Sequence, residues 1–309
     1  MHHIIVNPAA GKGRTVQLML LLAELMDDSE IPYMTHITAA AMDGFNIAKS
    51  VCELKETQAV IGIGGDGTLQ EIVAGMISAK ECAGTQNIPL GIFAAGSGND
   101  FAISIEGSKT AAITARKKSK KDAVYDFFEK LCERRTRFVD VITANGLAYL
   151  NVGNIGIDAR IVSNAVALKP TFGRHAYLAA TYRSIVQHEN LRLKIRVDGK
   201  NLDGKYTLVA ACNGRYYGGG MHISPSAEID DGKITLCMVD ELSRPKIMVL
   251  FPSLMAERHE KLKAVRYLNC KTATIIPEKP ITLCLDGNLY PEQKEIRFKI
   301  LPKALEVFV

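Results

Sequence analysis

Paired cysteines are absent from this sequence, and its histidines are not spaced as metal ligands. Seven cysteines lie singly along the chain, without a C-x-x-C pair: Cys52, Cys82, Cys132, Cys212, Cys237, Cys270 and Cys284. The odd count argues against a disulfide framework, so we expect most of these cysteines to be small core residues of a protein in a reducing compartment. The seven histidines form no ligand pattern, and we expect no zinc site.

Long apolar runs are also absent. No run reaches the ~18 residues of a membrane-spanning helix. The N-terminus passes directly into a strand-like segment and lacks the apolar region of a signal peptide. We therefore expect a cytoplasmic protein. Its 309 residues suit two domains, and 47% apolar with 23% charged residues is typical of a globular chain.

The sequence has only a small excess of positive over negative charge, with a formal net charge of +5. The densest basic run extends from Arg116 to Lys121. It can bind an anionic membrane surface at about 1 kcal/mol per basic residue, or it can be a solvated loop or a first helical turn. No aromatic residues are interleaved with the run, so we expect no nucleic-acid partner.

The most informative stretch that is present runs from Ala59 to Gly75. Its apolar start predicts a buried strand, and apolar residues recur at helical spacing from Leu69. The glycines between them leave room for a ligand, and the following helix start attracts an anion. A phosphate-binding corner is predicted, although a tight strand-to-helix turn is the plainer interpretation. Asp66 would repel bare phosphate and so favours a metal-bound triphosphate.

Strands alternate with helices in the first part of the chain. We predict strands at 3–6, 34–38, 59–63 and 89–93 and a helix at 44–54. This alternation predicts a mainly parallel sheet, with ligands gathered at the carboxyl ends of its strands. Thr38, Gly65 and the polar Ser97, Asn99 and Asp100 would all reach that edge. The turn at 7–13 is a further candidate phosphate corner, or an ordinary turn between a strand and a helix.

The pattern changes at Phe138. Short apolar runs recur at 138–142, 148–157, 191–197, 206–212, 234–239, 273–276 and 281–285, often separated by Asn-Gly or Asp-Gly pairs. Such punctuation is typical of hairpins, so an antiparallel sandwich or barrel is predicted. Helical interruptions are predicted at 173–188 and 244–257.

Two acidic turns stand out in this second part. Asp230-Asp231-Gly232 follows a run of three glycines, and Asp286-Gly287-Asn288 follows an apolar strand. By itself each is a common turn sequence. A carboxylate that emerges from a strand beside glycine is also well placed to accept a proton from a substrate hydroxyl.

Several of these segments resemble the diacylglycerol kinase catalytic family, which includes bacterial lipid kinases and sphingosine and ceramide kinases. The loop GGDGT with LQEIVAG is similar to its nucleotide loop, Asn7 to Gly11 to its N-P-x-x-G element, and Ser97 to Ala102 to its G-T-x-N-D-F-A segment. The glycine run Gly218–Gly220 is followed by P-x-A at 225–227 and then by D-D-G at 230–232, an order that resembles the pattern of the bacterial lipid kinases. The resemblance spans nearly the whole chain. The family's D-G-E reads D-G-N here, because Asn288 replaces the glutamate.

The resemblance implies an α/β nucleotide-binding domain at 1–136, to which 294–309 return, and a β-rich lipid domain at 137–293. It implies ATP and Mg²⁺ as cofactors, with catalytic Asp286, Asp66 and Asp100. A structural Mg²⁺ would be bound by the Asp231 carboxylate and the carbonyls of Glu228 and Lys233. The implied nucleotide site is Asn7, Pro8, Ala9, Ala10, Gly11, Thr38, Gly64, Gly65, Asp66, Gly67, Thr68, Leu69, Gln70, Glu71, Ser97 and Asn99.

We therefore expect an ATP-dependent lipid kinase that acts on diacylglycerol or a related lipid while resting transiently on a membrane surface. A kinase of a soluble acceptor such as NAD stays open, because NAD kinases share the GGDG core. So does a nucleotide-binding regulator without catalysis, because Asn288 cannot accept a proton. A homodimer is neither indicated nor excluded.

Overall fold

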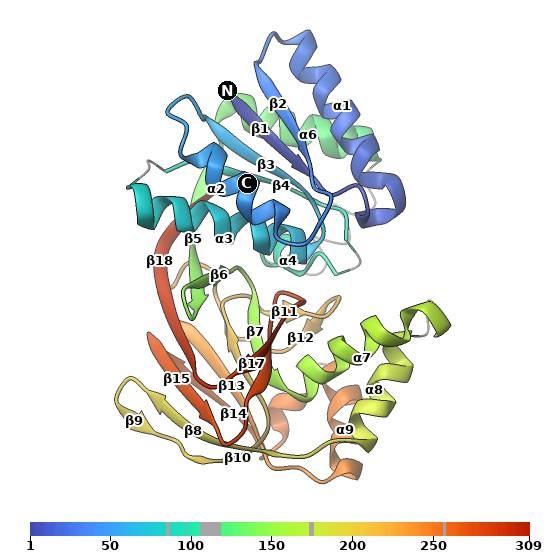
Figure 1. Cartoon of the computed structure of the whole chain (residues 1–309), viewed down its shortest axis with the longest axis vertical. Helices are drawn as coiled ribbons and strands as arrows, with labels where there is room; N and C mark the ends of the chain where they lie inside the picture. The colour runs from blue at the N-terminus through green and yellow to red at the C-terminus, as the bar shows by residue number, and fades with distance from the viewer. Residues whose placement is uncertain (85–86, 97, 106–118, 173–175, 256–257) are drawn as a thin grey trace.

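The computed structural model describes residues 1–84, 87–96, 98–105, 119–172, 176–255 and 258–309 (Figure 1). An α/β domain forms the N-terminal part, and a domain of antiparallel strands forms most of the rest. This confirms the predicted fold class. The elements of the first domain are β1 (His2–Val6), η1 (Ala10–Gly13), α1 (Arg14–Asp28), β2 (Tyr33–Ile37), α2 (Asp43–Cys52), β3 (Ala59–Gly64), α3 (Asp66–Ala83), β4 (Leu90–Ala94), α4 (Asp100–Ile105) and α6 (Lys120–Glu133).

The first domain is built on a parallel sheet in the order β2-β1-β3-β4. Helices cover both faces of this sheet. Because successive residues of a strand point to opposite faces, neighbouring residues of β3 pack against different helices. Val60 of β3 packs in one cluster with α2 and α3, whereas Ile61 and Ile63 pack in another with α1 and α6. All six residues of β3 are buried. The strand before the GGDGT loop is therefore central.

The second domain is antiparallel, with strands in the order β17-β16-β7-β10-β8-β15-β18 and with β13 and β14 branching from β10. In β8, buried Leu193, Ile195 and Val197 alternate with exposed residues, the pattern of a strand with one face on a core. The strands are β5 (Thr136–Ala144), β6 (Leu147–Tyr149), β7 (Val152–Gly156), β8 (Leu191–Val197), β9 (Lys200–Asn201), β10 (Gly204–Cys212), β11 (Tyr216–Tyr217), β12 (Met221–His222), β13 (Ile234–Asp240), β14 (Val265–Cys270), β15 (Thr272–Pro277), β16 (Ile281–Leu285), β17 (Asn288–Gln293) and β18 (Ile296–Phe308).

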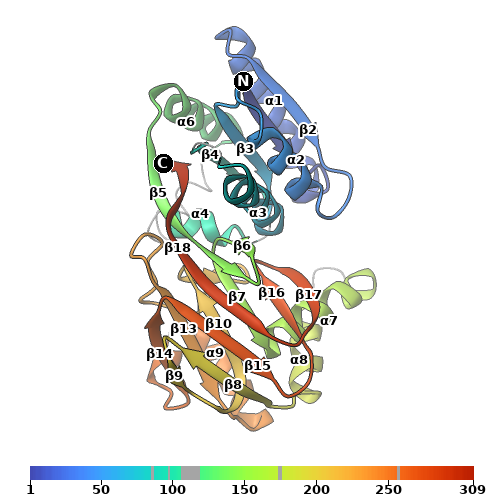
Figure 2. The ribbon, with the colours of Figure 1, turned by 60° about the vertical axis from the view of Figure 1, so that its left-hand side comes forward.

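The last strand, β18, connects the two sheets (Figure 2). Its first half pairs with β15, most of its length pairs with β5, and Val307 pairs in parallel with Leu90 of β4. The chain thus ends beside the sheet with which it began. One continuous strand gives the two domains a common sheet.

The second domain also contains helices α7 (Ile157–Phe172), α8 (Ala176–Val186) and α9 (Arg244–Met255) and the short η3 (His259–Lys261). The prediction of an apolar strand run at 148–157 was wrong at its end, because Ile157 begins α7. Ile157 and Ile161 are buried against α8 and the sheet at helical spacing, and this packing selects the helix. The predicted helices at 173–188 and 244–257 correspond to α8 and α9, except that 173–175 and 256–257 lie outside the described residues.

The basic run is described only in part, since 116–118 lie outside the described residues. Ser119 caps α6 through a capping box with Asp122, so Lys120 and Lys121 occupy the first helical turn. No helix among the described residues is long and apolar enough to cross a membrane.

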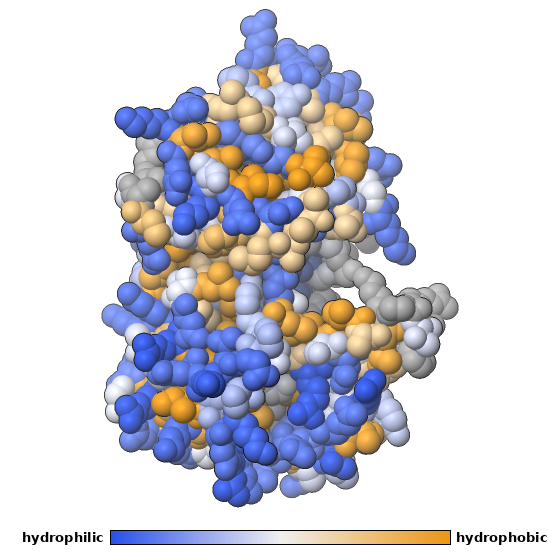
Figure 3. Space-filling model, in the orientation of Figure 1, coloured by the Kyte–Doolittle hydropathy of each residue, from blue (hydrophilic) through white to orange (hydrophobic). Residues whose placement is uncertain are grey.

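Large apolar side chains are exposed on the helices of the second domain (Figure 3). They are Val166 of α7, Tyr182 and Val186 of α8, and Met248 and Val249 of α9. These helices pack side by side, α7 against α8 and α8 against α9. The three neighbouring helices of the second domain therefore each present at least one large apolar side chain to the surface.

Candidate active site

Three glycine-containing loops meet at the carboxyl edge of the parallel sheet. A Cβ atom added to Gly65 would lie 3.3 Å from Gly96 Cα, and one added to Gly11 would lie 2.6 Å from the Ala95 carbonyl oxygen. These backbones can approach so closely only because the glycines have no side chain. The loops after β1, β3 and β4 are thus brought together, as the sheet topology predicts.

Asn7 connects two of these loops. Its Nδ2 donates to Thr68 Oγ1 at 2.9 Å, and its Oδ1 accepts the Ala9 amide, which closes the turn through Pro8 and Ala10. The Thr38 amide donates to the Val6 carbonyl beside this turn. At Gly64, an added Cβ would lie 2.6 Å from the Thr68 side chain. The expected nucleotide residues from Asn7 to Gly11, with Thr38, Gly64 and Thr68, therefore lie at one edge.

Asp66 begins α3 and binds the loop after β4. Its carboxylate accepts the backbone amides of Asn99 at 2.7 Å and Asp100 at 2.8 Å. Burial raises the pKa of the Asp66 carboxyl, and these amide bonds oppose the shift. The backbone amides of Phe101 and of Asp66 itself also donate to this carboxylate, so Asp66 is anchored firmly at the start of α3.

Asp100 reaches across to the second domain. Its carboxylate accepts the amides of Gly219 at 3.0 Å and Gly220 at 2.7 Å, both in the glycine run. Those glycines have φ of 91° and 97°, a conformation that other residues rarely adopt. The glycine run thus presents its N–H groups to a carboxylate of the first domain.

The chemistry around Gly98 fits a divalent cation. A Cβ added there would lie 2.7 Å from Asp66 Oδ2 and 2.9 Å from Asp100 Oδ2, so both carboxylates border the same small space. Asn99 Oδ1 is buried nearby and has no hydrogen-bond partner among the described residues. Oxygens of this kind are the ligands that Mg²⁺ prefers. Ser97, also expected here, lies outside the described residues.

Asp286 occupies the two-residue turn between β16 and β17, where it has a left-handed φ of 45°. Its carboxylate accepts the amides of Leu150 at 2.7 Å, Asn151 at 3.1 Å and Val152 at 2.8 Å. Burial raises the pKa of Asp286 to about 7 despite these bonds, and the charge of Asp66 contributes to the rise. Burial is therefore the main cause of the raised pKa at Asp286, and the charge of Asp66 adds to it.

Leu69, Gln70 and Glu71 were also expected at the nucleotide site, and their side chains are engaged within the protein. Leu69 packs in the core on α2, and Gln70 is fully buried. Glu71 accepts the amides of Met42 at 3.0 Å and Gly44 at 3.2 Å at the start of α2. On a helix only some positions face the loop, so a contiguous motif overstates the number of contacts.

Gln70 instead connects three segments. Its Nε2 donates to the Ala148 carbonyl at 2.8 Å, and its Oε1 accepts Asn288 Nδ2 at 2.8 Å and the Tyr290 hydroxyl at 3.0 Å. Asn288 Nδ2 also donates to the Gly67 carbonyl at 3.0 Å. The residue that departs from the family pattern is therefore bound to the first turn of α3.

The expected structural-metal residues lie in an exposed turn. Asp231 Oδ1 accepts the Lys233 amide at 3.0 Å, and the Lys233 ammonium lies 3.6 Å from Asp231 Oδ2. Glu228 forms an ion pair with Arg215 at 3.8 Å. Among the described residues no cluster of three His, Cys, Asp or Glu side chains could hold a metal, so a site here would depend on backbone carbonyls.

Buried Asp140 was not anticipated from the sequence. Its carboxylate accepts the amides of Gly232 at 2.6 Å and Lys303 at 2.7 Å. Asp140 thereby joins the acidic turn to β18. Its partners lie 92 and 163 residues away in the sequence, so no local pattern indicates this role.

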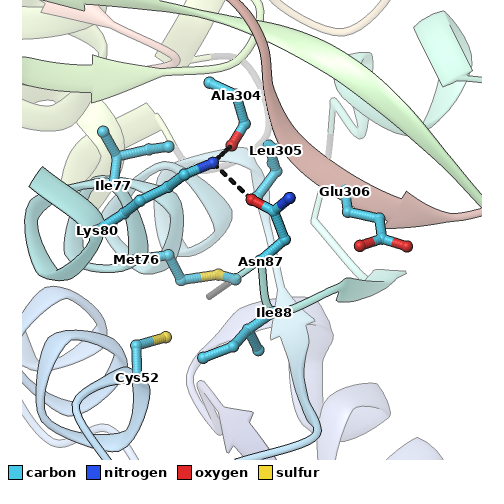
Figure 4. Close-up of a pocket in the computed structure, with 9 residues that line it drawn as sticks. All are labelled: Cys52, Met76, Ile77, Lys80, Asn87, Ile88, Ala304, Leu305 and Glu306. Carbon is cyan, nitrogen blue, oxygen red and sulfur yellow. Dashed lines mark hydrogen bonds between the residues drawn. The ribbon is translucent and has the colours of Figure 1, made fainter. Parts of the chain in front are cut away.

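A small pocket lies apart from these loops, between α2, α3 and β18 (Figure 4). Its volume of about 20 Å³ is close to that of a single water site. Lys80 Nζ donates there to Asn87 Oδ1 at 2.6 Å and to the Ala304 carbonyl at 3.1 Å. The pocket is too small for a nucleotide, and Lys80 joins α3 to β18 beside it.

Comparison with known proteins gives matches over both domains. Residues 2–144 match the family model of the diacylglycerol kinase catalytic domain, and residues 151–309 match that of the YegS C-terminal NAD kinase beta sandwich-like domain. A diacylglycerol kinase of Mycobacterium tuberculosis (strain ATCC 25618 / H37Rv) is 28% identical over 308 residues, which cover 98% of this chain and 93% of the relative.

Two further matches agree with these. A protein of Shewanella frigidimarina (strain NCIMB 400), named "Probable lipid kinase YegS-like", is 27% identical over 248 residues, or 80% of this chain and 74% of the relative. A solved Bacillus anthracis str. Sterne protein assigned to the diacylglycerol kinases superimposes with a TM-score of 0.74 at 20% identity. That alignment covers 99% of this chain and 94% of the other, and it shows a common fold.

Proposed function

This chain belongs to the diacylglycerol kinase catalytic family and is a lipid kinase with ATP as phosphate donor, and we propose that its acceptor is the hydroxyl of diacylglycerol or a related lipid. The observation that carries the proposal is the hydrogen-bonded link between the two domains at this site, where Asp66 binds the loop after β4 and Asp100 binds the glycine run of the second domain. Asp286 of the second domain is a buried carboxyl whose pKa is raised to about 7. A general base of that pKa suits catalysis near neutral pH.

Phosphoryl transfer depends on positioning and on neutralising charge more than on covalent catalysis. We assign the triphosphate to the meeting loops, with the backbone at 7–11, Thr38, the Gly64–Thr68 corner and Asn99. Asp66 and Asp100 would hold Mg²⁺, which supplies positive charge to the phosphate oxygens. Asp286 would take the proton of the attacking hydroxyl. The carbonyls of Glu228 and Lys233, with Asp231, remain the proposed structural-metal ligands.

A membrane-held acceptor is supported by the apolar side chains on α7, α8 and α9. Soluble proteins rarely expose apolar side chains in large contiguous patches unless the patch binds something. We propose that this side rests transiently on the bilayer from which the lipid enters.

The decisive experiment is transfer of labelled phosphate from ATP to a panel of diacylglycerol, monoacylglycerol, ceramide and sphingosine in mixed micelles. NAD is included as a soluble acceptor. We expect the wild type to label diacylglycerol and the Asp66→Asn variant to label no lipid. A panel without any labelled lipid, from an enzyme that binds ATP, would refute the proposal.

The alternative acceptor is NAD, since the model matched by the second domain is described as similar to the NAD kinase sandwich. Labelled NADP without labelled lipid would decide for it. ATP binding without transfer to any acceptor would instead favour the regulator.

A further inference from the structure

We propose that Asn288 is a positioning residue whose side-chain amide must donate hydrogen bonds, and that it holds the Asp286 turn against the first turn of α3. The inference rests on the proposed function, because it concerns the placement of the proposed base relative to the phosphate corner. It assigns to Asn288 a role of its own, although the residue cannot accept a proton.

The contacts of Asn288 are two acceptors on the same helix. Its Nδ2 donates to the Gly67 carbonyl at 3.0 Å and to Gln70 Oε1 at 2.8 Å. Gly67 is also packed against this side chain, since an added Cβ would lie 2.8 Å from Asn288 Oδ1. A primary amide has two N–H groups, so one nitrogen can satisfy both acceptors.

The orientation of the Gln70 amide follows from its other neighbours. The Ala148 carbonyl can only accept, so the nitrogen of Gln70 must face it. The oxygen of Gln70 must then face Asn288 and Tyr290. Gln70 is fully buried, so it cannot turn outward and find water instead. Position 288 therefore faces acceptor oxygens, and a donor there makes bonds to Gln70 Oε1 and the Gly67 carbonyl that the Tyr290 hydroxyl alone does not supply.

The same contacts control Asp286. The turn consists of Asp286 and Gly287, and Leu285 pairs with Asn288 directly across it. The Asp286 carboxylate fixes one side of the turn to the amides of 150–152, and the Asn288 amide fixes the other side to α3. Asp286 is thereby held at a set position relative to α3, the helix that Asp66 begins.

An acid at position 288 would not fit this arrangement. An ionised carboxylate has no donor, and it would face two acceptor oxygens near Asp66 and Asp286. The amide thus adds no further negative charge to a site that already contains Asp66, Asp100 and Asp286. This matters because the donor substrate is itself a polyanion.

The test compares Asn288→Asp, which has the same shape but no donor when ionised, with Asn288→Ala and Asn288→Glu. Turnover and thermal unfolding are measured from about pH 8 to about pH 5, each relative to the wild type at the same pH. We expect turnover at the upper pH to fall at least about tenfold in Asn288→Asp, further than in Asn288→Ala. Acidification should partly restore Asn288→Asp, because a protonated carboxyl regains one donor, and should not restore Asn288→Ala.

A merely space-filling role would predict the reverse order, with Asn288→Asp milder than Asn288→Ala and no recovery in acid. That result would overturn the inference, and so would an Asn288→Glu variant as active as the wild type. The unfolding measurement needs no substrate. If the wild type labels no lipid, the proposed function fails, whereas the order of unfolding temperatures for Asp and Ala at 288 still decides whether a donor is required.

Discussion

Acidification should increase the contribution of Asp286 to stability and decrease its capacity to accept a proton in the reaction. The pKa of this carboxyl is raised from 3.8 to about 7 in the folded chain, chiefly by burial. Between these two values the folded state keeps a proton that the unfolded chain releases. The resulting stability is complete below the unfolded pKa and is lost as the pH rises through the folded pKa.

The magnitude follows from the same shift. Lowering the pH from about 8 to about 5 should increase the free energy of unfolding through this group by about 3 kcal/mol. Turnover should fall over the same range, by about tenfold for each pH unit below 7, because only the ionised carboxylate can accept the hydroxyl proton.

Chemical denaturation of the metal-free protein, followed at several pH values, measures the first effect. Asp286→Asn should lack the acid-dependent gain, whereas Glu278→Gln, a change at an exposed surface carboxylate, should follow the wild type. Phosphate transfer at saturating Mg-ATP measures the second effect, and the residual activity of Asp286→Asn should be independent of pH. Identical pH dependence of unfolding in Asp286→Asn and the wild type would refute the assigned shift. Full turnover at pH 5 would refute the role as base.

Three shorter predictions concern the other parts of the site. Gly98→Ala should lower phosphate transfer by more than about tenfold and should also lower the unfolding temperature, since its Cβ would lie 2.7 Å from Asp66 Oδ2 and 2.9 Å from Asp100 Oδ2 and would displace them; unchanged transfer would show that this space is not used. Asp100→Ala should lower the free energy of unfolding in urea by about 1–3 kcal/mol, because the amides of Gly219 and Gly220 lose their partner. Val249→Asp should weaken sedimentation with lipid vesicles without a change in unfolding temperature, and equal sedimentation would exclude α9 from the membrane contact.

Local sequence signals account for much of the first domain. The four strands and the helix between the second and third of them were predicted because each has a periodic apolar pattern of its own. The boundaries differ by a residue or so, as at β2, which covers Tyr33–Ile37 instead of 34–38. The meeting of the glycine loops was predicted as well, since the carboxyl ends of neighbouring parallel strands share one edge.

The second domain was less predictable because its patterns are ambiguous at the boundaries. The apolar run that ends at Ile157 contains two short strands and the start of α7, and its composition suits either structure. Strands β14 and β17 were not anticipated, because neither has clean alternation: β17 contains Pro291 and is mostly half-buried or exposed. Pairing with β13 and β16 determines them instead.

The sequence by itself determined the family, the two fold types and the residues that carry acidic, amide and glycine chemistry at the site. Only the tertiary structure decided which groups those residues bind. Asp66 binds amides 33 and 34 residues away, Asp100 binds amides 119 and 120 away, and Asn288 binds α3 across 218 and 221 residues. A carboxylate or an amide has the same local sequence signal whether it meets a metal, a substrate or a distant backbone N–H group. Its role is therefore set by the partner that the packed sheets bring to it.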